Sequence, residues 1–197
     1  WLYHKEMWTF HNNLETPHTY QSNPFTWLVQ LRATSFHWAT GDEITGCRSG
    51  TCATDIVALG NPLLWWVGIG ALLLVVWTTC YYRSWRTGTI ALGYVALYVP
   101  WLAYAHRTIF TFYTVVFAPF VALAVGWMVA VIAGAVAADG HAAHAPLPLR
   151  DRATGWLLAT IITLAIIACA LYFLPLWRAD VVDYEFWRAH MWLRTWI

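Results

Sequence analysis

Four long runs without an acidic or basic residue constrain this chain more than any other feature of its sequence. They occupy the intervals between positions 55 and 83, 86 and 106, 107 and 139, and 152 and 178. A helix needs about 20 apolar residues to cross the hydrocarbon core of a bilayer, and each run can supply them. Lipid leaves no backbone polar group hydrated, and the runs lack the alternation of barrel strands. The sequence therefore predicts four transmembrane α-helices.

The composition supports a membrane location. Of the 197 residues, 60% are hydrophobic, 11% are charged and 15 are tryptophan. A soluble domain of this size could not bury so much apolar surface. The net charge of +1 gives no basic footprint for nucleic acid, so we expect no nucleic-acid partner. Because the chain begins at Trp1 without a methionine, we expect a mature or truncated piece of a longer protein.

Amphipathic segments flank the apolar runs. In "WLYHKEMWTFHNNL", aromatic and aliphatic residues recur at helical spacing, which predicts a helix along the membrane surface with Trp1 and Trp8 at headgroup depth. Pro17 should end this helix. The closing "VVDYEFWRAHMWLRTWI" has a similar mixture and predicts a second interfacial segment. We therefore expect an all-α membrane protein with three regions: residues 1–55 (interfacial helix and polar loop), 56–178 (four crossings) and 179–197 (tail).

Cysteines suggest the orientation, which the arginine distribution leaves open. Four crossings put both termini on one side, and "CRSGTC" spaces Cys47 and Cys52 so that they can form a disulfide. A disulfide persists in oxidising compartments, so we expect both termini outside the cytoplasm and Arg83 and His141 facing it. The alternative is two unpaired thiols in a loop. The remaining cysteines, at positions 80 and 169, should be ordinary core residues of helices.

No metal or other cofactor is predicted. The two loop cysteines lack a second pair of ligands. His141 and His144 could ligate a metal as HxxH, but no third ligand is spaced to join them. A solvated loop of alanine, proline and histidine is the preferred interpretation of that segment.

The stretch "YAHRTIFTFY" contains the charge most in need of explanation. Arg107 lies between two apolar runs, where a cation is costly unless it has a partner. Its guanidinium is a planar fork of donors suited to a phosphate. The alternative is an arginine at the headgroup boundary that contacts membrane lipid. The residues alone leave these two interpretations open.

Four stretches together resemble a known family. In chain order they are "FHNNLETPHTYQSNPFTWL", "LGNPLLWWVG", "PWLAYAHRTIFTFYTVVFAPF" and "MWLRTWI", and they resemble the C-terminal half of bacterial protein O-mannosyltransferases, particularly actinobacterial ones. The resemblance covers nearly the whole chain. It implies part of a larger, multi-spanning GT-C glycosyltransferase of the cell membrane. Such an enzyme takes mannose from a polyprenyl phosphate and transfers it to Ser or Thr of an exported polypeptide.

The resemblance also implies site residues. It places Arg107, with His106 beside it, at the donor phosphate. The pocket residues that it implies are His18, Tyr20, Ser22, Asn23, Trp66 and Tyr113. The alternative for the polar stretch around Asn23 is a simple turn with an interfacial histidine.

The chain departs from the family pattern by lacking a counterpart to the N-terminal half, which carries the family's acidic catalytic residue. Glu15 is the nearest local carboxylate, but the resemblance gives it no role as a base. We therefore expect this chain alone to be inactive, with the catalytic base outside it. Two alternatives remain: a different lipid-phosphate sugar transferase of the same fold class, and a membrane scaffold or partner subunit without chemistry.

Overall fold

The computed structural model describes residues 1–41, 44–47, 50–137 and 149–197, and it is mostly helical. The α-helices are α1 (Leu2–Asn12), α2 (Pro62–Tyr82), α3 (Trp85–Ala103), α4 (Ala118–Ile132), α5 (Leu149–Trp177) and α6 (Tyr184–His190). The strands are β1 (Thr34–Thr40), β2 (Cys52–Ala58) and β3 (Val182–Asp183). Short 3₁₀ helices are η1 (Pro24–Thr26), η3 (Thr111–Val116) and η4 (Arg194–Trp196).

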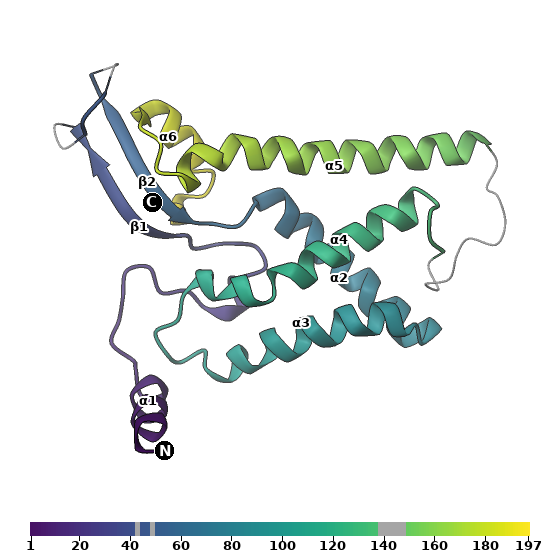
Figure 1. Cartoon of the computed structure of the whole chain (residues 1–197), viewed down its shortest axis with the longest axis horizontal. Helices are drawn as coiled ribbons and strands as arrows, with labels where there is room; N and C mark the ends of the chain where they lie inside the picture. The colour runs from purple at the N-terminus through teal and green to yellow at the C-terminus, as the bar shows by residue number, and fades with distance from the viewer. Residues whose placement is uncertain (42–43, 48–49, 138–148) are drawn as a thin grey trace.

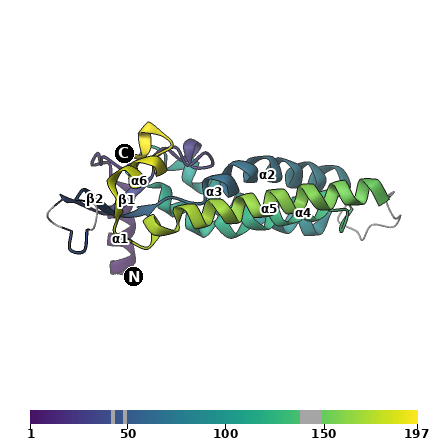
Figure 2. The same ribbon diagram turned by 90° about the horizontal axis from the view of Figure 1, so that it is seen from above.

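Helices α2 to α5 form an elongated bundle, with the sheet, α1 and α6 gathered at one end (Figures 1 and 2). Both ends of the chain lie at that same end, and the turn between α2 and α3 lies at the other (Figure 1). Helix α2 and residues 151–177 of α5 are long and apolar enough to cross a membrane, while α4 is a shorter apolar helix. Asn61 starts α2 by accepting a hydrogen bond from the Leu64 N–H at 3.1 Å.

The core of the bundle lies where α2, α3 and α4 meet. Ala71 and Val75 of α2 and Val121 and Ala124 of α4 are fully buried. Glycine allows the close approach of these helices: a Cβ at position 68 would lie 2.5 Å from a methyl of Val121. Helix α5 is much less enclosed, because most of its apolar side chains are exposed along its length.

The structure corrects the all-α prediction, because the chain also contains a three-stranded antiparallel sheet in the order β1-β2-β3. Strand β1 pairs with β2 from Thr34 to Thr40, and β2 pairs with β3 at Cys52 and Ala53. The sequences "TSFHWAT" and "CATDIVA" are rich in β-branched and aromatic residues, which favour strands. Part of the region expected to be a polar loop therefore forms two paired strands.

The third apolar run is not one continuous helix. Helix α4 begins only at Ala118, with Pro119 in its first turn. Upstream of it, the Thr108 hydroxyl donates to the Thr16 carbonyl at 2.5 Å, and the Thr111 hydroxyl donates to the Arg32 carbonyl. These bonds hold residues 108–116 against the N-terminal segment instead of extending α4.

The two flanking segments also differ from expectation. Helix α1 ends at Asn12, before Pro17, and none of its residues is buried. In the C-terminal segment, Trp187, His190 and Trp196 are buried against α5 and the sheet. Part of the expected interfacial tail is therefore packed into the protein.

Candidate functional site

A cavity of about 170 Å³ lies between α1 and the end of α3. Its lining residues are Trp8, His11, Asn12, Pro100, Trp101, Tyr104 and Arg107. Aromatic side chains dominate the walls, and a guanidinium provides the positive charge. Such a cavity suits a ligand that combines an apolar body with an anionic group.

Arg107 is the residue of this cavity with unsatisfied hydrogen-bonding capacity. Its Nε is buried and has no hydrogen-bond partner within the described residues. The guanidinium carbon lies 5.5 Å from the centroid of the Tyr104 ring, a cation–π distance. The backbone is fixed because the Arg107 N–H donates to the Tyr104 carbonyl at 3.0 Å. A buried donor without a partner is costly, so a bound anion would stabilise this arrangement.

The polar N-terminal segment lies directly beside Arg107. The Thr108 N–H donates to the Leu14 carbonyl at 3.0 Å, next to the bond between Thr108 and Thr16. Glu15 lies between these two acceptors and is exposed. The structure therefore brings the polar loop and Arg107 together, although they are far apart in the sequence.

Ser22 has a structural role in this segment. It is buried, and its hydroxyl accepts a hydrogen bond from Trp27 Nε1 at 2.8 Å and is hydrogen-bonded to the Thr111 hydroxyl at 3.0 Å. Trp27 is fully buried, packed between Phe117 and Trp101. These contacts tie the polar loop to η3 and α3.

The other residues of the polar loop are more accessible. His18 is exposed, and its ring centroid lies 5.2 Å from that of Phe110 in an edge-to-face arrangement. Its Nδ1 accepts a hydrogen bond from the Tyr20 N–H at 3.1 Å. Asn23 caps η1 by accepting a hydrogen bond from the Phe25 N–H at 3.0 Å. None of these three residues, His18, Tyr20 or Asn23, lines the cavity of Arg107.

The remaining predicted residues, Tyr113, His106 and Trp66, differ in their distance from the cavity. Tyr113 stacks on Trp101 with ring centroids 4.8 Å apart, which places it directly behind the cavity wall. His106 is exposed and does not line the cavity. Trp66 donates to the Val29 carbonyl at 3.0 Å and its ring faces Trp192, so it connects the segment after η1 to the C-terminal segment.

Sequence reasoning missed the aromatic walls and an anchoring arginine. The spacing of Trp101 and Tyr104 at the end of an apolar run, one helical turn before Arg107, was an available signal for the walls. Arg32 donates to the carbonyls of Thr195, Ile197 and Thr19 at 2.6, 3.0 and 2.9 Å. Those acceptors are separated from it in the sequence, so no local pattern marks them.

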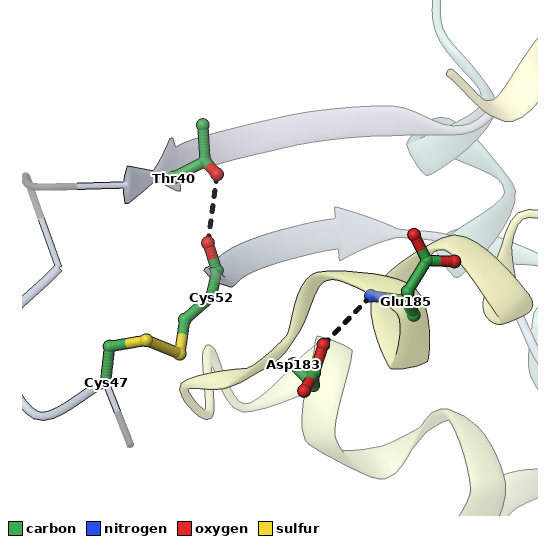
Figure 3. Close-up of a disulfide and its surroundings, with 5 residues drawn as sticks. All are labelled: Thr40, Cys47, Cys52, Asp183 and Glu185. Carbon is green, nitrogen blue, oxygen red and sulfur yellow. Dashed lines mark hydrogen bonds between the residues drawn. A yellow bond between two sulfur atoms is a disulfide. The ribbon is translucent and has the colours of Figure 1, made fainter. Parts of the chain in front are cut away.

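Cys47 and Cys52 are joined by a disulfide with a Cα–Cα distance of 5.7 Å (Figure 3). Beside it, the Thr40 hydroxyl donates to the Cys52 carbonyl at 2.9 Å, which joins the last residue of β1 to the first residue of β2 (Figure 3). Of the other cysteines, Cys169 is buried and Cys80 is exposed. Among the described residues no group of three or more histidine, cysteine or acidic side chains could hold a metal, and His141 and His144 lie outside them.

Asp55 joins the sheet to α6. Its carboxylate accepts hydrogen bonds from the Ser35 hydroxyl at 2.7 Å and from Trp187 Nε1 at 2.9 Å. Burial raises the pKa of the Asp55 carboxyl above its ordinary value, while these two bonds and the nearby His37 partly oppose that rise. Its two bonded partners account for both carboxylate oxygens, which indicates a structural rather than a catalytic carboxylate.

Comparison with known proteins places this geometry in context. Residues 1–196 match the protein family described as the C-terminal four TMM region of protein-O-mannosyltransferase. The chain is similar to polyprenol-phosphate-mannose–protein mannosyltransferases of Mycolicibacterium smegmatis, at 27% identity, and of Mycobacterium tuberculosis, at 24%. The alignment covers 100% of this chain in both cases, and 37% and 36% of those proteins.

A more distant relative is the yeast dolichyl-phosphate-mannose–protein mannosyltransferase 1, 33% identical over 88 residues, which are 43% of this chain and 9% of that protein. No solved structure matches the chain. The chain spans little more than a third of the length of the bacterial relatives. With the family match extending over residues 1–196, the chain belongs to the C-terminal four-transmembrane region of the protein O-mannosyltransferases.

Proposed function

We propose that this chain is the C-terminal portion of a polyprenyl-phosphate-mannose-dependent protein O-mannosyltransferase, which mannosylates Ser or Thr of exported polypeptides. The observation that carries this proposal is Arg107, which lines a cavity with aromatic walls and whose buried Nε has no hydrogen-bond partner in the part of the chain that the structure describes. A polyprenyl phosphate presents an anion next to an apolar chain, which matches both features of the cavity. The names of the bacterial relatives support the same donor.

Arg107 would stabilise the leaving group in this reaction. The acceptor hydroxyl attacks the anomeric carbon, the bond from that carbon to the phosphate oxygen breaks, and its electron pair goes to the phosphate. A cation positioned at the phosphate lowers the free energy of that developing charge. A base must take the hydroxyl proton, and we assign that role to an acidic residue outside this chain.

The other candidates take supporting positions in this proposal. His106 lies next to Arg107 in the chain and is exposed, so it can contact the phosphate only from the rim. His18, Tyr20 and Asn23 belong to the loop that the acceptor would approach. Ser22, Tyr113 and Trp66 would act by positioning that loop, the cavity wall and the C-terminal segment, respectively.

In the membrane, we propose that α2, α3, α4 and α5 cross the bilayer and that α1 and parts of residues 179–197 contact its extracytoplasmic surface. Both termini, the sheet and the Arg107 cavity would then face outward. The clustering of both termini, the sheet and α1 at one end of the bundle supports this arrangement (Figure 1). The disulfide at the tip of the hairpin supports the choice of side.

This orientation makes a labelling prediction. In intact cells that carry Cys80→Ser and Cys169→Ser, a membrane-impermeant maleimide should label Cys47 and Cys52 only after an impermeant reductant is added. The reason is that the thiols are bonded to each other and lie outside. Labelling without reductant would contradict the bond, and labelling only after the cells are permeabilised would contradict the orientation.

Sugar transfer tests the function itself. The full-length protein that contains this chain, in lipid nanodiscs with polyprenyl-phosphate mannose, should mannosylate a threonine-rich peptide. The same peptide with alanine at every Ser and Thr is the control. Transfer only from a different lipid-phosphate sugar would favour another transferase of this fold class. Absence of transfer from every lipid-linked sugar would favour the scaffold alternative.

A further inference from the structure

Strand β1 has a free edge. In the sheet order β1-β2-β3, the strand pairs with β2 on one side, and within the described residues no strand pairs with its other side. Figure 1 shows the strand at the outer margin of the molecule, away from α5 and α6. Natural edge strands are usually protected by proline, lysine or an inward-pointing charge. A β-bulge, another protective feature, interrupts β1 between Ser35 and His37, but the part of the strand after it, "HWAT", contains no proline, lysine or acidic residue.

The register identifies the backbone groups on that edge. The Tyr184 N–H donates to the Thr51 carbonyl at 3.0 Å, so the backbone N–H and C=O groups of odd-numbered residues at this end of β2 point toward β3. The backbone groups of even-numbered residues therefore point toward β1. Ala39 is paired with Thr54, whose backbone groups point toward β1, so these two residues exchange hydrogen bonds. Trp38 and Thr40 therefore direct their N–H and C=O groups outward.

Aromatic contacts connect this edge to the Arg107 cavity. Phe36 lies at a bulge in β1, is largely exposed, and its ring centroid is 5.2 Å from that of Phe112. Phe112 contacts Tyr113 at 4.8 Å, and Tyr113 stacks on Trp101 of the cavity wall. The edge and the cavity therefore lie at the same end of the bundle and share one aromatic cluster.

We propose that the acceptor polypeptide binds as an added strand along the free edge of β1, with its side chains against Phe36. This inference rests on the proposed function and names how its acceptor would be held. Backbone groups spaced along a strand recognise any extended polypeptide, whatever its sequence. Lipid offers no donors or acceptors to these groups, so a polypeptide is the matching partner. Strand β1 is already paired with β2 from Thr34 to Thr40, so its edge is formed before a peptide binds.

Methylation of the acceptor backbone tests this mode of binding. In an added strand, every second N–H of the peptide bonds to β1 and the intervening ones point away. Two fluorescent threonine peptides are N-methylated on every second residue, the first on one alternate set, or phase, of backbone nitrogens and the second on the other set. All methyl groups lie at least three residues from the acceptor threonine. Binding to the full-length protein in nanodiscs is measured by fluorescence anisotropy. One phase should weaken binding by about tenfold or more, and the other by less than about twofold.

A pair of variants at one position tests the protein side. Thr40→Pro removes an outward N–H, whereas Thr40→Val retains it and removes only the hydroxyl bond to the Cys52 carbonyl. We expect Thr40→Pro to weaken peptide binding by about five- to tenfold and Thr40→Val to resemble the natural protein. Circular dichroism and disulfide closure check that both variants are folded. The methylated peptides are tested on the natural protein, so that experiment does not depend on the folding of either variant.

The outcomes separate this inference from the proposed function. Equal weakening by both methylation phases, or no peptide binding, would overturn strand addition. A dimer that dissociates in Thr40→Pro would also overturn it, because the edge would then pair with a second copy of the chain. Phase-dependent peptide binding without any mannose transfer would support the edge and reject the transferase function.

Discussion

Replacing Trp27 with alanine should lower the free energy of unfolding by roughly 3–5 kcal/mol, the usual cost of removing a fully buried tryptophan. The side chain fills the space between the polar loop, α3 and α4, where it packs against Phe117 and Trp101. Its Nε1 also donates to the Ser22 hydroxyl at 2.8 Å. The variant therefore loses both packing and a buried hydrogen bond.

Two further variants separate these contributions. Trp27→Phe keeps most of the packing but removes the bond to Ser22, so it should cost only about 1–2 kcal/mol. Trp85→Ala is the matched control, because that tryptophan is 73% exposed and should change stability by less than about 0.5 kcal/mol. Unfolding of the full-length protein in mild-detergent micelles by sodium dodecyl sulfate, followed by circular dichroism, measures all three. Equal stability of the Trp27→Ala and Trp85→Ala variants would contradict the described packing.

The helices could be located from the sequence because lipid imposes a simple requirement. Charge-free runs of sufficient length predict crossings. Helix α2 lies within the first predicted run, while α3 and α5 occupy most of the second and fourth runs and begin slightly before them. The third run predicts a helix that is too long. Its first part, around Thr108 and Thr111, is held by hydrogen bonds to a segment about 80 to 90 residues away in the sequence. Hydropathy cannot report such pairing.

The sheet was missed for a related reason. The segments "TSFHWAT" and "CATDIVA" are short, and the polar residues around them suggested a loop. Strand formation depends on the partner strand and on contacts such as that between Asp55 and Trp187, which are distant in the sequence. Turn residues between the strands could have raised the possibility of a hairpin, but the sequence alone does not indicate its free edge.

The candidate site was only partly predictable. Arg107 stands out because a cation between apolar runs needs a partner, and the structure places it in a cavity. Ser22 was expected in the pocket, yet its hydroxyl is bonded to Trp27 and Thr111. Trp66 lies against the C-terminal segment instead. A sequence motif shows which residues occur close together along the chain. The direction in which their side chains point depends on the packing of the folded protein.

The central claim is that Arg107 holds the donor phosphate. Charge-assisted hydrogen bonds contribute roughly 1.5–3 kcal/mol each, so Arg107→Ala should slow mannose transfer by about ten- to a hundredfold in the full-length enzyme. Arg107→Lys should restore only part of the rate, because lysine keeps the charge but loses the planar fork. Arg178→Ala is the control for loss of a positive charge, since Arg178 is exposed and lies 3.7 Å from Asp180.

Turnover per folded molecule in these variants is the most direct measurement, with the folded fraction taken from size-exclusion chromatography in detergent. We expect a large loss for Arg107→Ala, an intermediate rate for Arg107→Lys and a normal rate for Arg178→Ala. An arginine that only contacts lipid headgroups would behave differently: Arg107→Lys would match the natural enzyme, and Arg107→Ala would reduce the yield of folded protein rather than its rate. Unchanged turnover per folded molecule in Arg107→Ala would contradict the phosphate-binding role.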